Sequence, residues 1–259
     1  MKRKTRKAGA LLSALLLTLV LGGCEIPMPG FADYDVSGYI QALLDSSYHN
    51  SHSGFMTVAQ ATTEAAMKNH TSTVGNAVVN FCNTYGVSPS EEEQAQLQEV
   101  FSQLLSQAQY TVREEQKVDT GYYIEVEVTP ISNFSDCAGQ LATLREQAQQ
   151  EADEANAPEP TPSPEPEDEW GWEEDSWGEE GEDEESPIAT PVPVTERVDP
   201  NKLYLEKVLD FCRQQAAAPA YGVARTLALN IRQTDNGELQ LDLNEIDKID
   251  QTVLQFTPG

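Results

Sequence analysis

Residues 122–129 read Tyr-Tyr-Ile-Glu-Val-Glu-Val-Thr, and this stretch decides the fold. Apolar side chains alternate in it with mostly polar ones, which is the pattern of a β-strand with one buried and one solvated face. The preceding residues 110–117 are joined to it by Asp119-Thr120-Gly121, a turn whose glycine can adopt a positive φ. We therefore expect a β-hairpin in the middle of the chain.

A second hairpin is predicted near the C-terminus, where residues 223–231 and 239–243 flank the turn Asp235-Asn236-Gly237. Around the two hairpins, apolar residues recur at helical spacing. The predicted helices cover residues 35–47, 61–85, 89–108, 137–148, 199–212 and 244–256. We expect an α+β fold in which helices pack on one face of a four-stranded antiparallel sheet made of two hairpins.

Capping residues indicate where these helices begin and end. Asp35 is the expected N-cap of the first helix. Gly86 is expected to end the long helix predicted over residues 61–85. Ser88, with Glu91 three residues later, is expected to start the next helix as a capping box. Asn244 is the expected N-cap of the last helix.

The first 23 residues have the pattern of a signal peptide. Basic residues dominate the first seven positions, and an uncharged run rich in Leu and Ala follows over residues 8–21. At about 14 residues, this run is shorter than the roughly 20 that a membrane-spanning helix needs. The tetrapeptide Leu21-Gly22-Gly23-Cys24 resembles a bacterial lipobox, which implies cleavage before Cys24 and a diacylglyceryl group on its sulfur. An ordinary secretory signal with a chance cysteine is the alternative.

A lipid on Cys24 would hold the mature protein at the outer face of the cytoplasmic membrane without spanning it. Residues 24–34 would then form a short tether to the folded part, because they are rich in proline and glycine. The chain as a whole is strongly acidic: 43 Asp and Glu residues face 16 Lys and Arg residues, for a formal net charge of −27, and five of the basic residues lie in the leader. Such a field repels nucleic acid and anionic headgroups, so the expected membrane contact is the lipid and no nucleic-acid partner is expected.

Residues 157–199 interrupt the predicted domain. They begin with a proline-rich run and hold 14 acidic residues and no basic one between residues 158 and 187. Such a segment cannot bury enough apolar surface to offset its ordering entropy. We predict a disordered acidic insertion in a single domain formed by residues 35–156 and 200–259. Two domains on a linker are the alternative, which is disfavoured because an isolated hairpin is marginally stable.

All three tryptophans of the chain, Trp170, Trp172 and Trp177, lie inside this insertion. Aromatic side chains set among carboxylates suit a cationic or sugar-bearing partner, so a basic envelope protein or a wall glycan is the expected contact. The alternative interpretation is a solvated spacer.

Three cysteines remain once Cys24 carries lipid: Cys82, Cys137 and Cys212. An odd number rules out complete pairing, and no CxxC or other ligand spacing relates them. We expect buried thiols on apolar helix faces. A disulfide between Cys137 and Cys212 is the alternative.

Catalytic and metal-binding motifs are absent from the sequence. His49 and His52 have a spacing that occurs in metal sites, but they lie in a segment rich in Ser and Asn that we expect to be a solvated loop. The third histidine is His70, and no nucleophile elbow, Ser-x-x-Lys motif or phosphate-binding glycine loop is present. We expect no catalytic residue, no metal and no cofactor.

The chain resembles a family of small lipoproteins, a domain of unknown function, from Gram-positive, clostridial-type anaerobes. The resemblance is carried by Tyr39-x-x-Ala-Leu-Leu-Asp45-x-x-Tyr48, the helix end at residues 81–86, Tyr110-Thr-Val-Arg-Glu, Asp119-x-Gly121-Tyr-x-Ile-x-Val-x-Val-x-Pro130 and residues 243–254. It implies an envelope lipoprotein and assigns no activity. The long acidic insertion departs from the short polar connection that the family has at this place.

The leading interpretation is a lipid-anchored, non-catalytic binding or interaction module of the cell envelope. One alternative is the solute-binding component of a transporter, a class that resembles two α/β lobes. The other is an envelope enzyme whose Tyr, Asp and His side chains converge in a cleft. A cleft with convergent polar groups favours ligand binding, whereas a flat acidic face favours contact with protein or wall.

Overall fold

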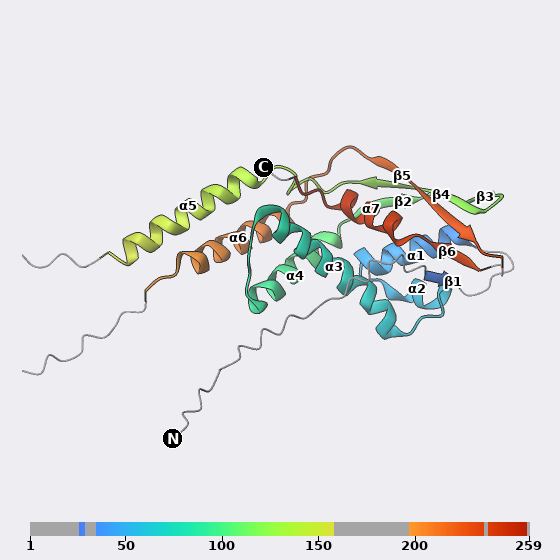
Figure 1. The fold of residues 1–259 in the computed structure, drawn as a ribbon, viewed down its shortest axis with the longest axis horizontal. Coiled ribbons are helices and arrows are strands. Elements are labelled where there is room, and N and C mark those ends of the chain that lie inside the picture. Colours follow the sequence, from blue (N-terminus) through green and yellow to red (C-terminus); the bar gives the residue numbers. More distant parts are fainter. Residues whose placement is uncertain (1–25, 29–34, 158–196, 236–237, 258–259) are drawn as a thin grey trace, which may run out of the picture.

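The computed structural model describes residues 26–28, 35–157, 197–235 and 238–257. Helices and strands alternate in blocks along these ranges, and the fold is α+β as expected (Figure 1). In chain order the elements are β1 (Ile26–Met28), α1 (Val36–Tyr48), α2 (His52–Val58), α3 (Thr63–Tyr85), α4 (Glu91–Leu105), β2 (Gln109–Val112), β3 (Gln116–Val118), β4 (Gly121–Thr129), α5 (Ala138–Ala155), α6 (Pro200–Ala217), β5 (Arg225–Gln233), β6 (Leu239–Leu241) and α7 (Leu243–Val253).

The sheet is antiparallel and is built around β4, the strand that the alternating pattern predicts. β5 pairs with β4 along one side, and β2 and β3 share the other side. Ile124 lies opposite Leu229 and Val126 lies opposite Leu227. Ile124, Val126 and Leu229 are fully buried, so the alternation also selects the face that packs against the helices. The two predicted hairpins therefore join into one sheet through β4 and β5.

The sheet is larger than the predicted four strands, because residues 26–28 add an edge strand. β1 pairs antiparallel with β6, with Ile26 opposite Leu241 and Met28 opposite Leu239. The expectation of a simple tether over residues 24–34 is therefore wrong for these three residues. A three-residue strand carries no local signal of its own and exists only because β6 offers an open edge.

The predicted strand 110–117 is divided into β2 and β3. Arg113, Glu114 and Glu115 lie between them, and the carboxylate of Glu115 accepts a hydrogen bond from the Ser37 N–H at 3.3 Å. This contact is at the N-terminus of α1, where backbone N–H groups lack partners within the helix. The strand is interrupted because Glu115 is used to satisfy that end of α1.

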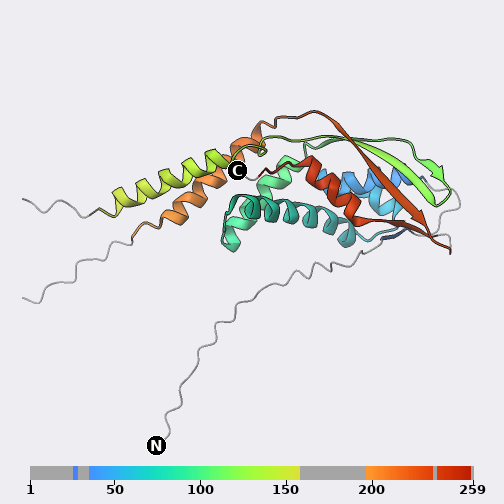
Figure 2. The same cartoon turned by 45° about the horizontal axis from the view of Figure 1, so that its top comes forward.

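The helices α1, α3, α4 and α7 lie beneath one face of the sheet, which curls over them (Figures 1 and 2). α7 contacts β4 and β5, α1 contacts β2, and α3 packs between α1 and α4. Phe81, Phe101 and Phe134 are fully buried and form an aromatic cluster, with ring centroids 5.4 to 5.5 Å apart. This cluster joins α3 and α4 to the segment that follows β4.

α5 and α6 pack against each other and project from the body as an arm (Figures 1 and 2). At its tip, the Asn156 amide donates to the Val198 carbonyl and accepts from the Val198 N–H, each at 2.9 Å. The chain therefore leaves and re-enters the arm at one point. The predicted acidic insertion starts and ends there, and residues 158–196 lie outside the described residues.

The helix boundaries confirm two of the predicted caps and correct two. The Asp35 side chain accepts a hydrogen bond from the Gly38 N–H at 2.7 Å, and Gly86 ends α3 in the left-handed region at φ 63°. α4 begins two residues later than predicted, after Ser90 instead of Ser88. Ser90 forms the capping box because its N–H donates to the Glu93 carboxylate at 2.7 Å.

The last helix, in contrast to α4, begins earlier than predicted. Its N-cap is Asp242, whose carboxylate accepts a hydrogen bond from the N–H of Asn244 at 2.9 Å. Leu243 is therefore the first residue of α7. Its apolar side chain had indicated that it extends the preceding strand, and that prediction is wrong. Aspartate is as good an N-cap as asparagine, so the presence of both, two positions apart, leaves the helix start ambiguous in the sequence.

Candidate functional site

Two of the predicted sites lie outside the described residues: the lipobox Leu21, Gly22, Gly23 and Cys24, and the tryptophans Trp170, Trp172 and Trp177. Lipid attachment and partner binding at these residues stay predictions. Within the described ranges, no helix is long and apolar enough to cross a membrane.

His49 lies in the short exposed connection between α1 and α2, as expected, whereas His52 lies in a helix, contrary to expectation. His49 is the C-cap of α1 and its Nε2 donates to the Ala108 carbonyl at 3.0 Å, while its ring stacks on Tyr110. His52 opens the short helix α2, with its Nδ1 3.0 Å from the Ser46 hydroxyl. The two rings are thus held by different partners, and the part of the chain that is described contains no group of three or more His, Cys, Asp or Glu residues suited to a metal ion.

His70 joins three helices through its ring. Its Nδ1 donates to the Ser47 carbonyl at 2.8 Å, which leaves Nε2 as the acceptor of the Ser102 hydroxyl, also at 2.8 Å. Serine, imidazole and carbonyl in this order resemble an activated nucleophile. Ser102 lies inside α4, however, where the neighbouring backbone N–H groups are already bonded along the helix and cannot stabilise an oxyanion. We interpret the arrangement as a clamp between α1, α3 and α4.

The cysteines are free thiols, so the alternative of a disulfide between Cys137 and Cys212 is not observed. Both of these are buried, and Cys82 is half-buried. Burial raises the pKa of the Cys82 thiol to about 11 and also raises the pKa of Cys212. Thiols in this state are poor nucleophiles, which agrees with their expected role as small apolar side chains.

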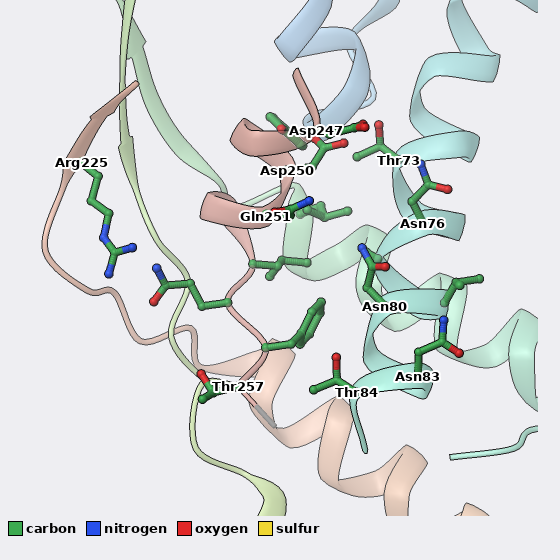
Figure 3. Close-up of a pocket in the computed structure, with 17 residues that line it drawn as sticks. Thr73, Asn76, Asn80, Asn83, Thr84, Arg225, Asp247, Asp250, Gln251 and Thr257 are labelled. Atoms are coloured by element: carbon green, nitrogen blue, oxygen red, sulfur yellow. Dashed lines mark hydrogen bonds between the residues drawn. The ribbon is translucent and has the colours of Figure 1, made fainter. Parts of the chain in front are cut away.

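A groove of about 700 Å³ lies between α3 and α7 (Figure 3). We call it the α3–α7 groove. Its walls are the polar face of α3 and the exposed face of α7 with the segment that follows it, and Arg225 at the start of β5 also lines it. Tyr48, Ala77, Leu105, Leu254 and Phe256 contribute to its floor.

The α3 wall is a column of short amide and hydroxyl side chains: Thr73, Asn76, Asn80, Asn83 and Thr84. Their spacing of three to four residues places them on one face of the helix, opposite the buried face that carries Val74, Val78 and Phe81. Asparagine and threonine are poor helix formers, each costing up to about 0.7 kcal/mol relative to alanine. None of these side chains caps the helix or has a hydrogen-bond partner in the described structure, and the three asparagines are exposed to solvent.

The α7 wall carries Asp247, Asp250 and Gln251. The fully buried Tyr48 of α1 donates a hydrogen bond to the Asp250 carboxylate from below. Burial is the main cause that raises the pKa of Asp250 to about 7; nearby Asp247 raises it further, and the Tyr48 hydroxyl opposes the shift. Burial and the carboxylate of Asp250 also hold the pKa of Tyr48 well above its usual range. At this wall, the groove thus carries a carboxyl group that is hydrogen-bonded to a buried tyrosine and has a pKa near neutrality.

Arg225 lies across the groove from α3, and Figure 3 shows Asn80 pointing into the space between the two helices, with Gln251 on the far side. Arg225 forms no ion pair within the described ranges of the chain. The groove therefore offers amides, hydroxyls, one guanidinium and an apolar floor. These groups can position a polar ligand, whereas none of them is an activated nucleophile.

Sequence reasoning does not single out this site, although part of its signal is visible. The repeat Asn76-x-x-x-Asn80-x-x-Asn83 marks a polar stripe at helical spacing. Tyr48 and Asp250 are 202 positions apart, so only the fold brings them together.

No protein-family model matches the sequence, and no curated protein matches it. The family resemblance given above therefore stays a prediction. Among solved structures, the fold is similar to the crystal structure of a candidate lipoprotein from Bacillus subtilis, with a TM-score of 0.48 and 9% identity over 85% of this chain. The similar region spans 56% of that protein, so this chain corresponds to a little over half of its length.

Proposed function

We propose that the protein is a lipid-anchored binding module on the outer face of the cytoplasmic membrane, with the α3–α7 groove as its ligand site. The observation that carries the proposal is the column of unpartnered amides and hydroxyls on α3, which faces a second polar wall across an apolar floor. A few polar groups above an apolar floor in a groove of this volume are typical of ligand sites.

Binding without catalysis fits the groups that are present. The histidine that contacts a serine, His70, lies outside the groove and acts as a helix clamp. One antiparallel sheet with helices on one face also differs from the two α/β lobes expected of a transporter's solute-binding component. Both features support the interaction module over the two alternatives.

Anchoring rests on the lipobox and on the leader being too short to span. The Trp-bearing acidic insertion, which starts and ends at the tip of the α5–α6 arm, is a second proposed contact, with a basic envelope protein or wall glycan as its partner. The described chain leaves and re-enters the arm at Asn156 and Val198, and neither of these two residues lines the groove.

Site-specific photocrosslinking on intact cells tests the proposal. A photoreactive residue at position 80 faces the groove, and one at position 150 lies on an exposed position of the arm. We expect a discrete envelope component to be captured from position 80 and not from position 150. Capture of nothing from position 80, or the same products from both positions, would contradict the groove as the ligand site.

A further inference from the structure

We infer that the ligand of the α3–α7 groove is a neutral glycan, presented as a short run of hydroxyl-bearing sugar rings. This inference rests on the proposed function, since it names the ligand class of the same site. It depends on the chemistry of the walls, the balance of charge, the apolar floor and the state of the neighbouring strand edge.

The walls offer groups that both donate and accept hydrogen bonds. Asn76, Asn80 and Gln251 are primary amides and Thr73 is a hydroxyl, and none has a hydrogen-bond partner in the described structure. Sugar hydroxyls also donate and accept, so each can pair with such a side chain in either direction. From Asn76 to Asn83 the column extends about 10 Å along the helix, at 1.5 Å per residue. The wall is therefore long enough to contact more than one ring.

The charges of the groove favour a neutral ligand. Asp247 and Arg225 have opposite signs, and the carboxyl of Asp250 is already engaged by the Tyr48 hydroxyl. An anionic polymer would also meet the net charge of −27 of the whole chain. A cationic ligand would find one carboxylate without a hydrogen-bond partner, Asp247, opposed by Arg225. Neither sign of charge is selected.

The floor provides a surface for the apolar face of a sugar ring. Phe256 and Leu254 lie between the two polar walls, and the Phe256 ring is only partly buried. An aromatic face flanked by amides suits a ring whose hydroxyls lie at its rim and whose C–H groups lie on its faces.

An extended peptide shares the neutral polar chemistry but is usually recognised by a different kind of surface. Peptides of that kind add a strand to an open sheet edge. The groove is lined mainly by side chains of α3 and α7. On the neighbouring edge of β5, Asn230 is already engaged, because the Glu245 carboxylate accepts hydrogen bonds from its N–H at 2.6 Å and from its side-chain amide at 3.0 Å. The groove is thus walled by helical side chains, which favours a glycan.

Calorimetric titration of the full chain in detergent micelles tests the inference with defined trisaccharides. Chitotriose and cellotriose are the neutral probes, the de-acetylated chitosan trimer is the cationic probe, and trigalacturonate is the anionic probe. We expect at least one neutral trisaccharide to bind at least about tenfold more tightly than either charged one. Asn80→Ala should weaken that binding about tenfold, because one amide hydrogen bond to a ligand hydroxyl is lost. Gln150→Ala, which removes an exposed amide on α5, should leave it unchanged.

The absence of binding by both neutral trisaccharides, or neutral binding that Asn80→Ala leaves intact, would overturn the inference. Tighter binding of a charged trisaccharide would overturn it as well. The proposed function can survive that failure, because crosslinking at position 80 to a peptide or protein would keep the groove as the ligand site. If crosslinking at position 80 captures nothing, the site itself is wrong.

Discussion

Asp250 links the floor of the groove to the stability of the fold. Its carboxyl is held by the buried Tyr48, and burial raises its pKa to about 7. An aspartate in an unfolded chain has a pKa near 3.9. Between these two values the folded protein keeps a proton that the unfolded chain has lost. The free energy of unfolding that depends on Asp250 is therefore highest below about pH 4 and falls as the pH rises towards 7.

The variant Asp250→Asn should remove this loss of stability. Asparagine keeps the size of the side chain and an oxygen that accepts from Tyr48, but it carries no charge at any pH. We expect the free energy of unfolding of the variant, measured by urea denaturation from pH 4 to pH 8, to decline less than that of the wild type.

Asp247→Asn serves as the control for that measurement. Asp247 is exposed and contributes to the raised pKa of Asp250 through its charge. This variant should retain most of the decline in stability, which should be somewhat smaller and end at a lower pH. Parallel pH profiles for Asp250→Asn and the wild type would show that Asp250 is not the titrating group.

Asn80 exposes a conflict between stability and binding at a single position. Replacement by alanine improves the helix propensity of α3 and removes no hydrogen bond in the described structure. We expect Asn80→Ala to raise the free energy of unfolding by about 0.5 kcal/mol in thermal or urea denaturation. If the substitution lowers the free energy of unfolding instead, the Asn80 amide stabilises the fold, and its presence does not point to a ligand.

At the scale of elements, the start of α4 distinguishes two serines that are two positions apart, Ser88 and Ser90. Ser90 caps the helix through the box that it forms with Glu93, whereas Ser88 is exposed and precedes it. Ser90→Ala should lower the free energy of unfolding by about 1 kcal/mol, and Ser88→Ala should change it little. Equal effects of the two substitutions in thermal denaturation would place the helix start at the earlier serine.

The elements that carry their own local pattern could be predicted from the sequence. The alternation at residues 122–129 places β4 and its buried face, and Gly86 marks the end of α3. Helix starts were displaced where two capping residues stand close together, as with Ser88 and Ser90. β1 could not be predicted, because its only support is the open edge of β6.

The α3–α7 groove could not be predicted from the sequence, because it also depends on contacts between distant parts of the chain. Asn76, Asn80 and Asn83 are visible as a stripe on one helix, but a stripe of asparagines also describes an ordinary solvated face. It becomes a wall only when α7 is placed opposite. Tyr48 and Asp250 come from opposite ends of the chain, and no periodicity relates them.

At the scale of the whole molecule, the acidic insertion should be dispensable for folding. The chain leaves and re-enters the arm at Asn156 and Val198, and the segments on either side share one sheet through β4 and β5. Replacing residues 158–196 by a Gly/Ser loop of about six residues should stabilise the fold by about 1–2 kcal/mol, because loop-closure entropy falls with loop length. Calorimetry should show one cooperative transition within a few degrees of the wild type. Two separate transitions would indicate two domains on a linker.

The proposed function requires that a lipid on the first mature residue holds the protein at the membrane. Mass spectrometry of the N-terminal peptide from membrane-fraction protein measures this modification. We expect the mature chain to start at Cys24 and this residue to carry the mass of a diacylglyceryl group. The matched Cys24→Ala variant should lack the modification and be released or left unprocessed. An unmodified Cys24 in membrane-bound protein, or a Cys24→Ala variant that stays in the membrane with a normally processed N-terminus, would rule out the lipid anchor.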